Sequence, residues 1–272
     1  MFVFGRIQMV RSFVLLTSKQ PLVEVAEKNT EFEEINVDNV VEVLKKDAVY
    51  LGINLPKAIL EEILEFSKEA IYLGNGNAKF PFSLAEKEQQ EIKHEKKFIT
   101  GYNLNSAGMC PVIKKLENDY KLWQIAAKYL ERVPILIGSQ LWWTFANKEV
   151  VDERMQGMFR FHYDLEDYRF VKFMFYLTDV DLSSSPHIYV KGSHEKKKLR
   201  DQFSFLRDRD DKDILDYYGV ENVINICGEA GLGFAEDPFC LHKGTVPVRK
   251  DRLILEIKFA SNTYEFAPNT YR

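Results

Sequence analysis

Short apolar stretches rich in aromatic and β-branched residues follow one another from Pro134 onward, with turns between them. Stretches of this length and composition are typical of β-strands. Many short strands with helices gathered before them predict a β-sandwich of the jelly-roll type, covered by helices. The predicted strands are 135–145, 158–163, 170–177, 187–190, 223–226, 232–235, 241–248 and 253–260.

The first half of the chain has helical patterns. Asp38-Asn39 lies where a helix cap is expected, directly ahead of apolar residues at helical spacing. Pro56 is expected to open a helix that runs to about residue 70, and a second long helix is predicted over 112–132. A strand is predicted over 48–53, and the polar segment 74–95 predicts a loop or lid.

We interpret the chain as a single domain over 1–272. Its 272 residues are enough to bury a sizeable core, and no internal repeat or low-complexity segment divides it. The predicted fold class is mostly β with flanking α-helices. A double-stranded β-helix (a jelly-roll or cupin-like core) is expected over about 134–262, covered by a helical N-terminal part over about 1–133.

Composition argues against several classes of protein. A net charge of −4 gives no basic face for nucleic acid. No run of about 18 apolar residues is present, so we expect no membrane span, and the N-terminal segment lacks the features of a signal peptide. The three cysteines contain no CxxC pair, and their odd number argues against a disulfide scaffold, which predicts a cytoplasmic location.

His162 and Asp164 are separated by one residue at the end of a predicted strand. Alternate residues of a strand point to the same face, so the two side chains are expected to lie together. His-x-Asp alone arises by chance in many proteins. Here a second histidine, His242, follows 80 residues later (242 − 162), and Arg252 follows ten residues after that (252 − 242).

This set of side chains points to metal chemistry. Two imidazoles and one carboxylate form the facial triad that suits Fe(II), and they leave coordination positions open for a substrate and O2. The guanidinium fork of Arg252 can clamp the carboxylate of a bound co-substrate. Such a triad can only be assembled by tertiary folding, which a jelly roll achieves by closing one strand beside another.

Each of these residues also has an ordinary interpretation. The two histidines could be half-buried core residues, and Arg252 could pair with Asp251 or Glu256. The order and spacing of the whole set favour the metal site. A structural role is favoured for His187, which enters the strand before Gly192.

Further motifs accompany the triad. They are Phe161-His162-Tyr163-Asp164, Phe173-Met174-Phe175-Tyr176-Leu177-Thr178-Asp179-Val180, Val190-Lys191-Gly192-Ser193-His194, Gly231-Leu232-Gly233-Phe234 and Leu241-His242-Lys243-Gly244-Thr245. With them, residues 159–260 resemble the phytanoyl-CoA dioxygenase family of Fe(II)/2-oxoglutarate oxygenases. That family usually has Asn/Ser-Gly-Pro before its Gly-Ser-His, whereas Ser184-Ser185-Pro186 stands here, so the glycine of a turn is lost.

The resemblance implies that His162, Asp164 and His242 bind Fe(II) and that Arg252 anchors the far carboxylate of 2-oxoglutarate. It also suggests Gln140 as a polar contact to the co-substrate. The resemblance further implies hydroxylation of an unactivated C–H bond of a small molecule, with consumption of O2 and release of succinate and CO2. Thr245 is a second candidate for a co-substrate contact, and both it and Gln140 could instead hydrogen-bond a neighbouring strand.

Two alternative functions remain open from the sequence. One is a non-catalytic jelly-roll protein that binds a ligand without turnover. The other is the same iron centre performing desaturation or cyclisation, because the triad determines the oxidant and not the fate of the substrate. The segments 74–95, 98–109 and 202–218, which would contact a primary substrate, contain no readable motif, and the oligomeric state is not indicated.

Overall fold

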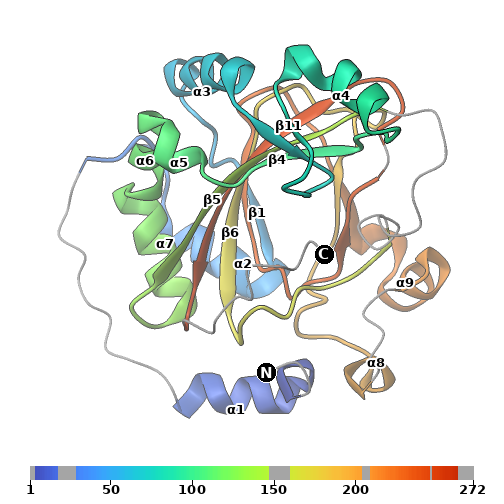
Figure 1. Ribbon diagram of the computed structural model, residues 1–272. Coiled ribbons are helices and arrows are strands. Elements are labelled where there is room, and N and C mark those ends of the chain that lie inside the picture. The colour runs from blue at the N-terminus through green and yellow to red at the C-terminus, as the bar shows by residue number, and fades with distance from the viewer. Residues whose placement is uncertain (1–3, 18–28, 147–159, 204–208, 246, 263–272) are drawn as a thin grey trace.

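Two antiparallel β-sheets face each other in the computed structural model, and helices cover the outer face of the larger sheet (Figure 1). The structure describes residues 4–17, 29–146, 160–203, 209–245 and 247–262. Within these ranges, no helix has the length and apolar character needed to cross a bilayer.

The helices lie mostly in the first half of the chain. Asn36 caps α2 by accepting a hydrogen bond from the backbone N–H of Asn39, and Pro56 stands directly before α3. The helices are η1 (Phe4–Arg6), α1 (Gln8–Thr17), α2 (Val37–Asp47), α3 (Lys57–Glu69), η2 (Leu84–Glu86), α4 (Lys87–Lys93), α5 (Ser106–Met109), α6 (Pro111–Glu117), α7 (Tyr120–Leu130), α8 (Leu199–Phe203), α9 (Asp211–Tyr218) and η4 (Val220–Asn222).

The strands form an eight-stranded sheet with the order β1-β9-β6-β11-β5-β4-β2-β3 and a three-stranded sheet with the order β10-β7-β8. From β5 onward the chain passes repeatedly between the two sheets, as in a jelly roll, which confirms the predicted fold class. The strands are β1 (Val49–Leu51), β2 (Tyr72–Gly74), β3 (Pro81–Phe82), β4 (Thr100–Asn103), β5 (Ile135–Thr144), β6 (Phe170–Tyr176), β7 (His187–Val190), β8 (Val223–Ile226), β9 (Gly233–Glu236), β10 (His242–Lys243) and β11 (Arg252–Ala260).

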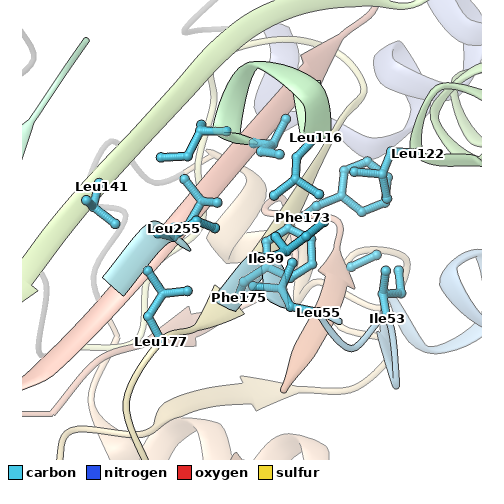
Figure 2. Packing of buried hydrophobic residues seen from close by; sticks show 14 of the residues in the cluster. Ile53, Leu55, Ile59, Leu116, Leu122, Leu141, Phe173, Phe175, Leu177 and Leu255 are labelled. Atoms are coloured by element: carbon cyan, nitrogen blue, oxygen red, sulfur yellow. The ribbon is translucent and has the colours of Figure 1, made fainter. Parts of the chain in front are cut away.

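Strand alternation separates two apolar layers. Phe173 and Phe175 of β6 point outward and pack with Leu116 and Leu122 of the helices (Figure 2). Met174 and Tyr176 point inward, where they meet aromatic side chains of both sheets. The helical layer therefore closes the outer face of the large sheet, and the space between the sheets is left for the functional side chains.

Three local predictions differ from the structure. The predicted helix 112–132 is broken into α6 and α7, because the carboxylate of Asp119 accepts hydrogen bonds from the backbone N–H groups of Lys121 and Leu122 and starts a new helix. The segment 74–95 is not a plain loop, since it contains β3 and α4, and Ser83 and Glu86 form a capping box ahead of α4.

The predicted strand 241–248 is shorter than expected, because among its described residues only His242 and Lys243 pair as a strand. Of the predicted strand 158–163, residues 158–159 lie outside the described residues. Phe161 and His162 each form an isolated bridge, to Arg209 and His242 respectively.

Candidate metal centre

His162 and His242 face each other across an antiparallel bridge. The N–H of His162 donates to the carbonyl of His242 at 2.9 Å, and the N–H of His242 donates to the carbonyl of His162 at 2.8 Å. Residues that exchange both hydrogen bonds carry their side chains on the same face, and the two ring centroids are 4.5 Å apart. The backbone pairing itself therefore brings the imidazoles together.

A hydrogen bond to a backbone carbonyl fixes the tautomer of each imidazole. Nδ1 of His162 lies 2.8 Å from the carbonyl oxygen of Arg160, and Nδ1 of His242 lies 2.9 Å from that of Cys240. Because a carbonyl can only accept, each Nδ1 carries a proton, so in the neutral imidazole the lone pair is on Nε2. This arrangement is typical of histidines that bind metal ions.

Asp164 completes the cluster. Its backbone N–H donates to the carbonyl of Pro238 at 2.8 Å. One possible ligand atom from each of Asp164, His162 and His242 lies within 4.8 Å of the other two. The donor set of two imidazoles and one carboxylate fits a divalent transition metal such as Fe(II).

The electrostatics of the cluster keep two of its side chains in the protonation states that bind a metal ion. Burial raises the pKa of the Asp164 carboxyl, but the ammonium of Lys172 and the two histidines outweigh it and hold that pKa well below its ordinary value. Burial, followed by the proximity of His162, lowers the pKa of His242 to about 3. At neutral pH the site therefore has one ionised carboxylate and, at His242, a neutral imidazole.

Arg252 is the first residue of β11 and lies opposite Thr144 of β5. One guanidinium nitrogen donates to the backbone carbonyl of Ser185, and the Nη2 atom donates to the hydroxyl of Thr144 at 3.3 Å. Nε is buried and has no hydrogen-bond partner among the described residues. Burial lowers the pKa of Arg252.

Arg252 forms no ion pair with Asp251 or Glu256. Asp251 instead accepts a hydrogen bond from the backbone N–H of Ala146, and Glu256 pairs with Lys172 and Lys258. Among the described residues, no carboxylate pairs with Arg252, so the ordinary interpretation of this arginine is wrong. A buried cation without a counter-ion favours an incoming anion such as a carboxylate.

Thr245 lies beside Arg252 through a shared neighbour, Ser185. The hydroxyl of Ser185 donates to the carbonyl of Thr245, and the carbonyl of Ser185 accepts from Arg252. The hydroxyl of Thr245 is buried and has no hydrogen-bond partner among the described residues. Ser185 has φ of 65°, a left-handed conformation that glycine adopts more readily, and it occupies the position where the family resemblance predicts a glycine.

Gln140 lies further along the same pair of strands. Its side-chain amide donates to Oε1 of Glu256 at 3.0 Å, and Glu256 is four residues along β11 from Arg252. The structure therefore brings Thr245 to the Arg252 end of the interior and holds Gln140 against Glu256.

Lys172 is a functional candidate that the sequence analysis missed. Its ammonium lies 2.9 Å from Oδ2 of Asp164 and 3.3 Å from Oε2 of Glu256. All seven residues of β6 are buried, and Lys172 is the charged residue among them. A lysine inside an otherwise apolar strand is the signal that could have identified it, since lysine is almost never fully buried without a partner.

His187 also lies close to the cluster. Its Nε2 is 3.0 Å from a carboxylate oxygen of the buried Glu236, and its ring centroid is 5.3 Å from that of His242. His187 therefore packs against a candidate metal ligand and places its own Nε2 toward a glutamate.

Solved structures of low sequence identity share this fold. The epimerase SnoN, in complex with Fe3+, alpha ketoglutarate and nogalamycin RO, is 11% identical over 82% of this chain and 83% of its own, with a TM-score of 0.56. HygX from Streptomyces hygroscopicus, with nickel, 2-oxoglutarate and hygromycin B bound, is 14% identical over 83% of this chain and 87% of its own, with a TM-score of 0.54.

EctD from S. alaskensis, with bound Fe, is 14% identical over 89% of this chain and 81% of its own, with a TM-score of 0.52. No family model and no curated protein sequence matches the chain. The likeness to these structures concerns the fold, and the membership of the phytanoyl-CoA dioxygenase family stays a prediction.

Proposed function

We propose that the chain is an Fe(II)- and 2-oxoglutarate-dependent oxygenase that hydroxylates a small-molecule substrate. The observation that carries this proposal is the cluster of His162, Asp164 and His242, in which each imidazole keeps Nε2 free because its Nδ1 bonds a backbone carbonyl. Arg252 supports it, since no carboxylate of the described residues pairs with its guanidinium and an anionic co-substrate would supply a counter-ion. SnoN and HygX, which share the fold, were crystallised with a metal and this co-substrate.

One group of residues would bind the metal ion, and a second group would bind 2-oxoglutarate. His162, Asp164 and His242 would hold the ion from one side and leave its other side open. Arg252 would hold the far carboxylate of 2-oxoglutarate, with Thr245 beside it and Gln140 as a further polar contact. The bound iron and 2-oxoglutarate would supply oxidation by O2, with release of succinate and CO2.

The apolar interior would keep water away from the reaction. Tyr176, Phe234 and Trp142 of the large sheet and Tyr189 of the small sheet are buried in one cluster between the sheets. Exclusion of water strengthens the electrostatic contacts inside the site and limits side reactions of the oxidant.

Succinate production tests the proposal. The protein is mixed with Fe(II), 2-oxoglutarate and air, and succinate is measured by NMR. We expect Fe(II)-dependent succinate from the wild type and none above background from Asp164→Ala. Asp216→Ala, which removes an exposed carboxylate of α9 paired with Lys212, is the matched control and should behave as the wild type. Equal succinate from Asp164→Ala and the wild type would contradict the proposal.

Product analysis separates hydroxylation from other outcomes at the same metal. SnoN is an epimerase, and SnoK, a carbocyclase from nogalamycin biosynthesis, shares the fold with a TM-score of 0.54. Hydroxylation adds an oxygen atom to the substrate, whereas desaturation and ring closure remove hydrogen without adding oxygen. A product that gains 18O from 18O2 supports hydroxylation, and a product without it supports one of the alternatives.

A further inference from the structure

A lysine side chain contacts one of the candidate metal ligands. Lys172 is the third of the seven buried residues of β6, on the inner face that strand alternation assigns also to Met174. Its Nζ is 2.9 Å from Oδ2 of Asp164, in the segment that follows the bridge at His162. Burial of a charge is costly without a well-placed partner, so this contact places the ammonium specifically.

Lys172 is itself held from the neighbouring strands. Oε2 of Glu256 on β11 lies 3.3 Å from its Nζ, and the other carboxylate oxygen of Glu256 accepts from Gln140 on β5 at 3.0 Å. Lys258 lies 3.6 Å from Glu256 and 2.6 Å from Glu166. Charges of alternating sign thus run along the inner face of the large sheet and end at Asp164.

This network limits how the ammonium can move. Glu256 fixes Lys172 relative to the large sheet, so the contact at 2.9 Å fixes the carboxylate of Asp164 relative to that sheet as well. Glu256 partly balances the charge of Lys172, and the hydrogen bond from Nζ gives that charge a fixed direction at Asp164. Carboxylates that bind metals are commonly oriented by a hydrogen bond of this kind.

We infer that Lys172 is a positioning residue: by holding one carboxylate oxygen, it fixes the rotation of Asp164 toward Nε2 of His162 and of His242. The inference rests on the proposed function, because it takes these three residues as metal ligands. Lys172 would contact neither the substrate nor the reacting atoms. Its role would be to pre-orient the one negative ligand of the site.

Binding of Co(II) to the full chain without O2 tests this role. Co(II) reports its ligand geometry through its visible absorption spectrum, and a competing chelator gives its affinity. The double variant Lys172→Met/Glu256→Gln removes the hydrogen bond to Asp164 while leaving the net charge unchanged. We expect Co(II) affinity about 10- to 100-fold weaker than in the wild type, together with an altered visible spectrum.

A second double variant is the matched control. Lys258→Met/Glu166→Gln removes the outer ion pair of the same network, again at constant net charge, and leaves the contact between Lys172 and Asp164 in place. Its Co(II) affinity and spectrum should match those of the wild type. Lys172→Arg keeps both the charge and a donor, and it should restore the wild-type spectrum.

The outcomes separate this inference from the proposed function. A wild type that binds no Co(II) would refute the metal site itself. A wild type that binds Co(II), with a Lys172→Met/Glu256→Gln variant of equal affinity and spectrum, would overturn the positioning role alone. If that variant does not fold by circular dichroism, Glu256→Gln decides, because it weakens the hold of the large sheet on Lys172. A Co(II) affinity and spectrum equal to those of the wild type would then overturn the role.

Discussion

Arg252 is buried among neutral partners, a backbone carbonyl and a threonine hydroxyl, and its Nε has no partner among the described residues. The guanidinium is thus a buried cation that can bind a carboxylate, and no described residue supplies that carboxylate. Much of the free energy of such a pair comes from satisfying a charge that has already lost its water on folding.

Arg252→Ala is therefore expected to weaken the binding of 2-oxoglutarate to the Co(II)-loaded protein by about 2–5 kcal/mol, because a charge-assisted pair in a buried site is lost. Isothermal titration calorimetry measures the change. Arg132→Ala is the control, since Arg132 hydrogen-bonds Asn262 and no part of the proposed site. An unchanged affinity in Arg252→Ala would show that another residue anchors the co-substrate.

Single residues also show where sequence reasoning succeeds and where it stops. His162 and Asp164 could be paired from their spacing in the sequence, although the structure has only an isolated bridge at His162 and no strand through Asp164. The contact of Lys172 with Asp164 could not, because it depends on how the segment after His162 lies against β6 in the folded chain. Ser185 was noticed as a lost glycine, but its bonds to Thr245 and Arg252 appear only in the folded chain.

Among the elements, β9 is placed by contact with the segment after β1. The carbonyl of Gly233 accepts hydrogen bonds from the backbone N–H groups of Gly52 and Ile53, each at 2.9 Å. A Cβ at position 233 would collide with the backbone carbonyl of Ile53, which cannot move aside as a side chain could. Glycine at this position therefore permits the close approach of the two segments.

Gly233→Ala is expected to lower the free energy of unfolding by about 1–3 kcal/mol, the usual cost of forcing extra volume into a packed region. Gly228→Ala is the control, because the Cβ added there would meet the flexible side chain of Leu232 at 2.6 Å rather than backbone. Urea unfolding followed by circular dichroism compares the two variants. If Gly233→Ala were as stable as Gly228→Ala, β9 and the segment after β1 could move apart at little cost in free energy.

Some helices and strands could be predicted from the sequence and others could not, for physical reasons. β6 and β11 are long and apolar, so their composition identified them. The break between α6 and α7 was missed because the apolar pattern continues through it, and only the side chain of Asp119 marks the new helix. β10 is shorter than predicted, and its pairing with β7 and the bridge to His162 are properties of tertiary structure.

For the whole molecule, the sequence predicted the jelly roll from the number and shortness of its strands, and the two facing sheets confirm it. The order of strands in the large sheet could not be predicted from the sequence, because β9, β6, β11 and β5 become neighbours through long-range pairing. That order brings His242 beside His162 and puts Arg252 on the inner face of the large sheet, next to Thr144. The proposed oxygenase function is thus a property of the assembled sheets.

The visible spectrum of the protein with Fe(II) and 2-oxoglutarate, recorded without O2, tests the central claim most directly. If His162, Asp164 and His242 hold Fe(II) with positions open for 2-oxoglutarate, adding the co-substrate should produce a weak, broad charge-transfer band. His242→Ala should not show the band, and Lys212→Met, at an exposed pair on α9, should retain it. Absence of the band in iron-loaded wild-type protein would contradict the account.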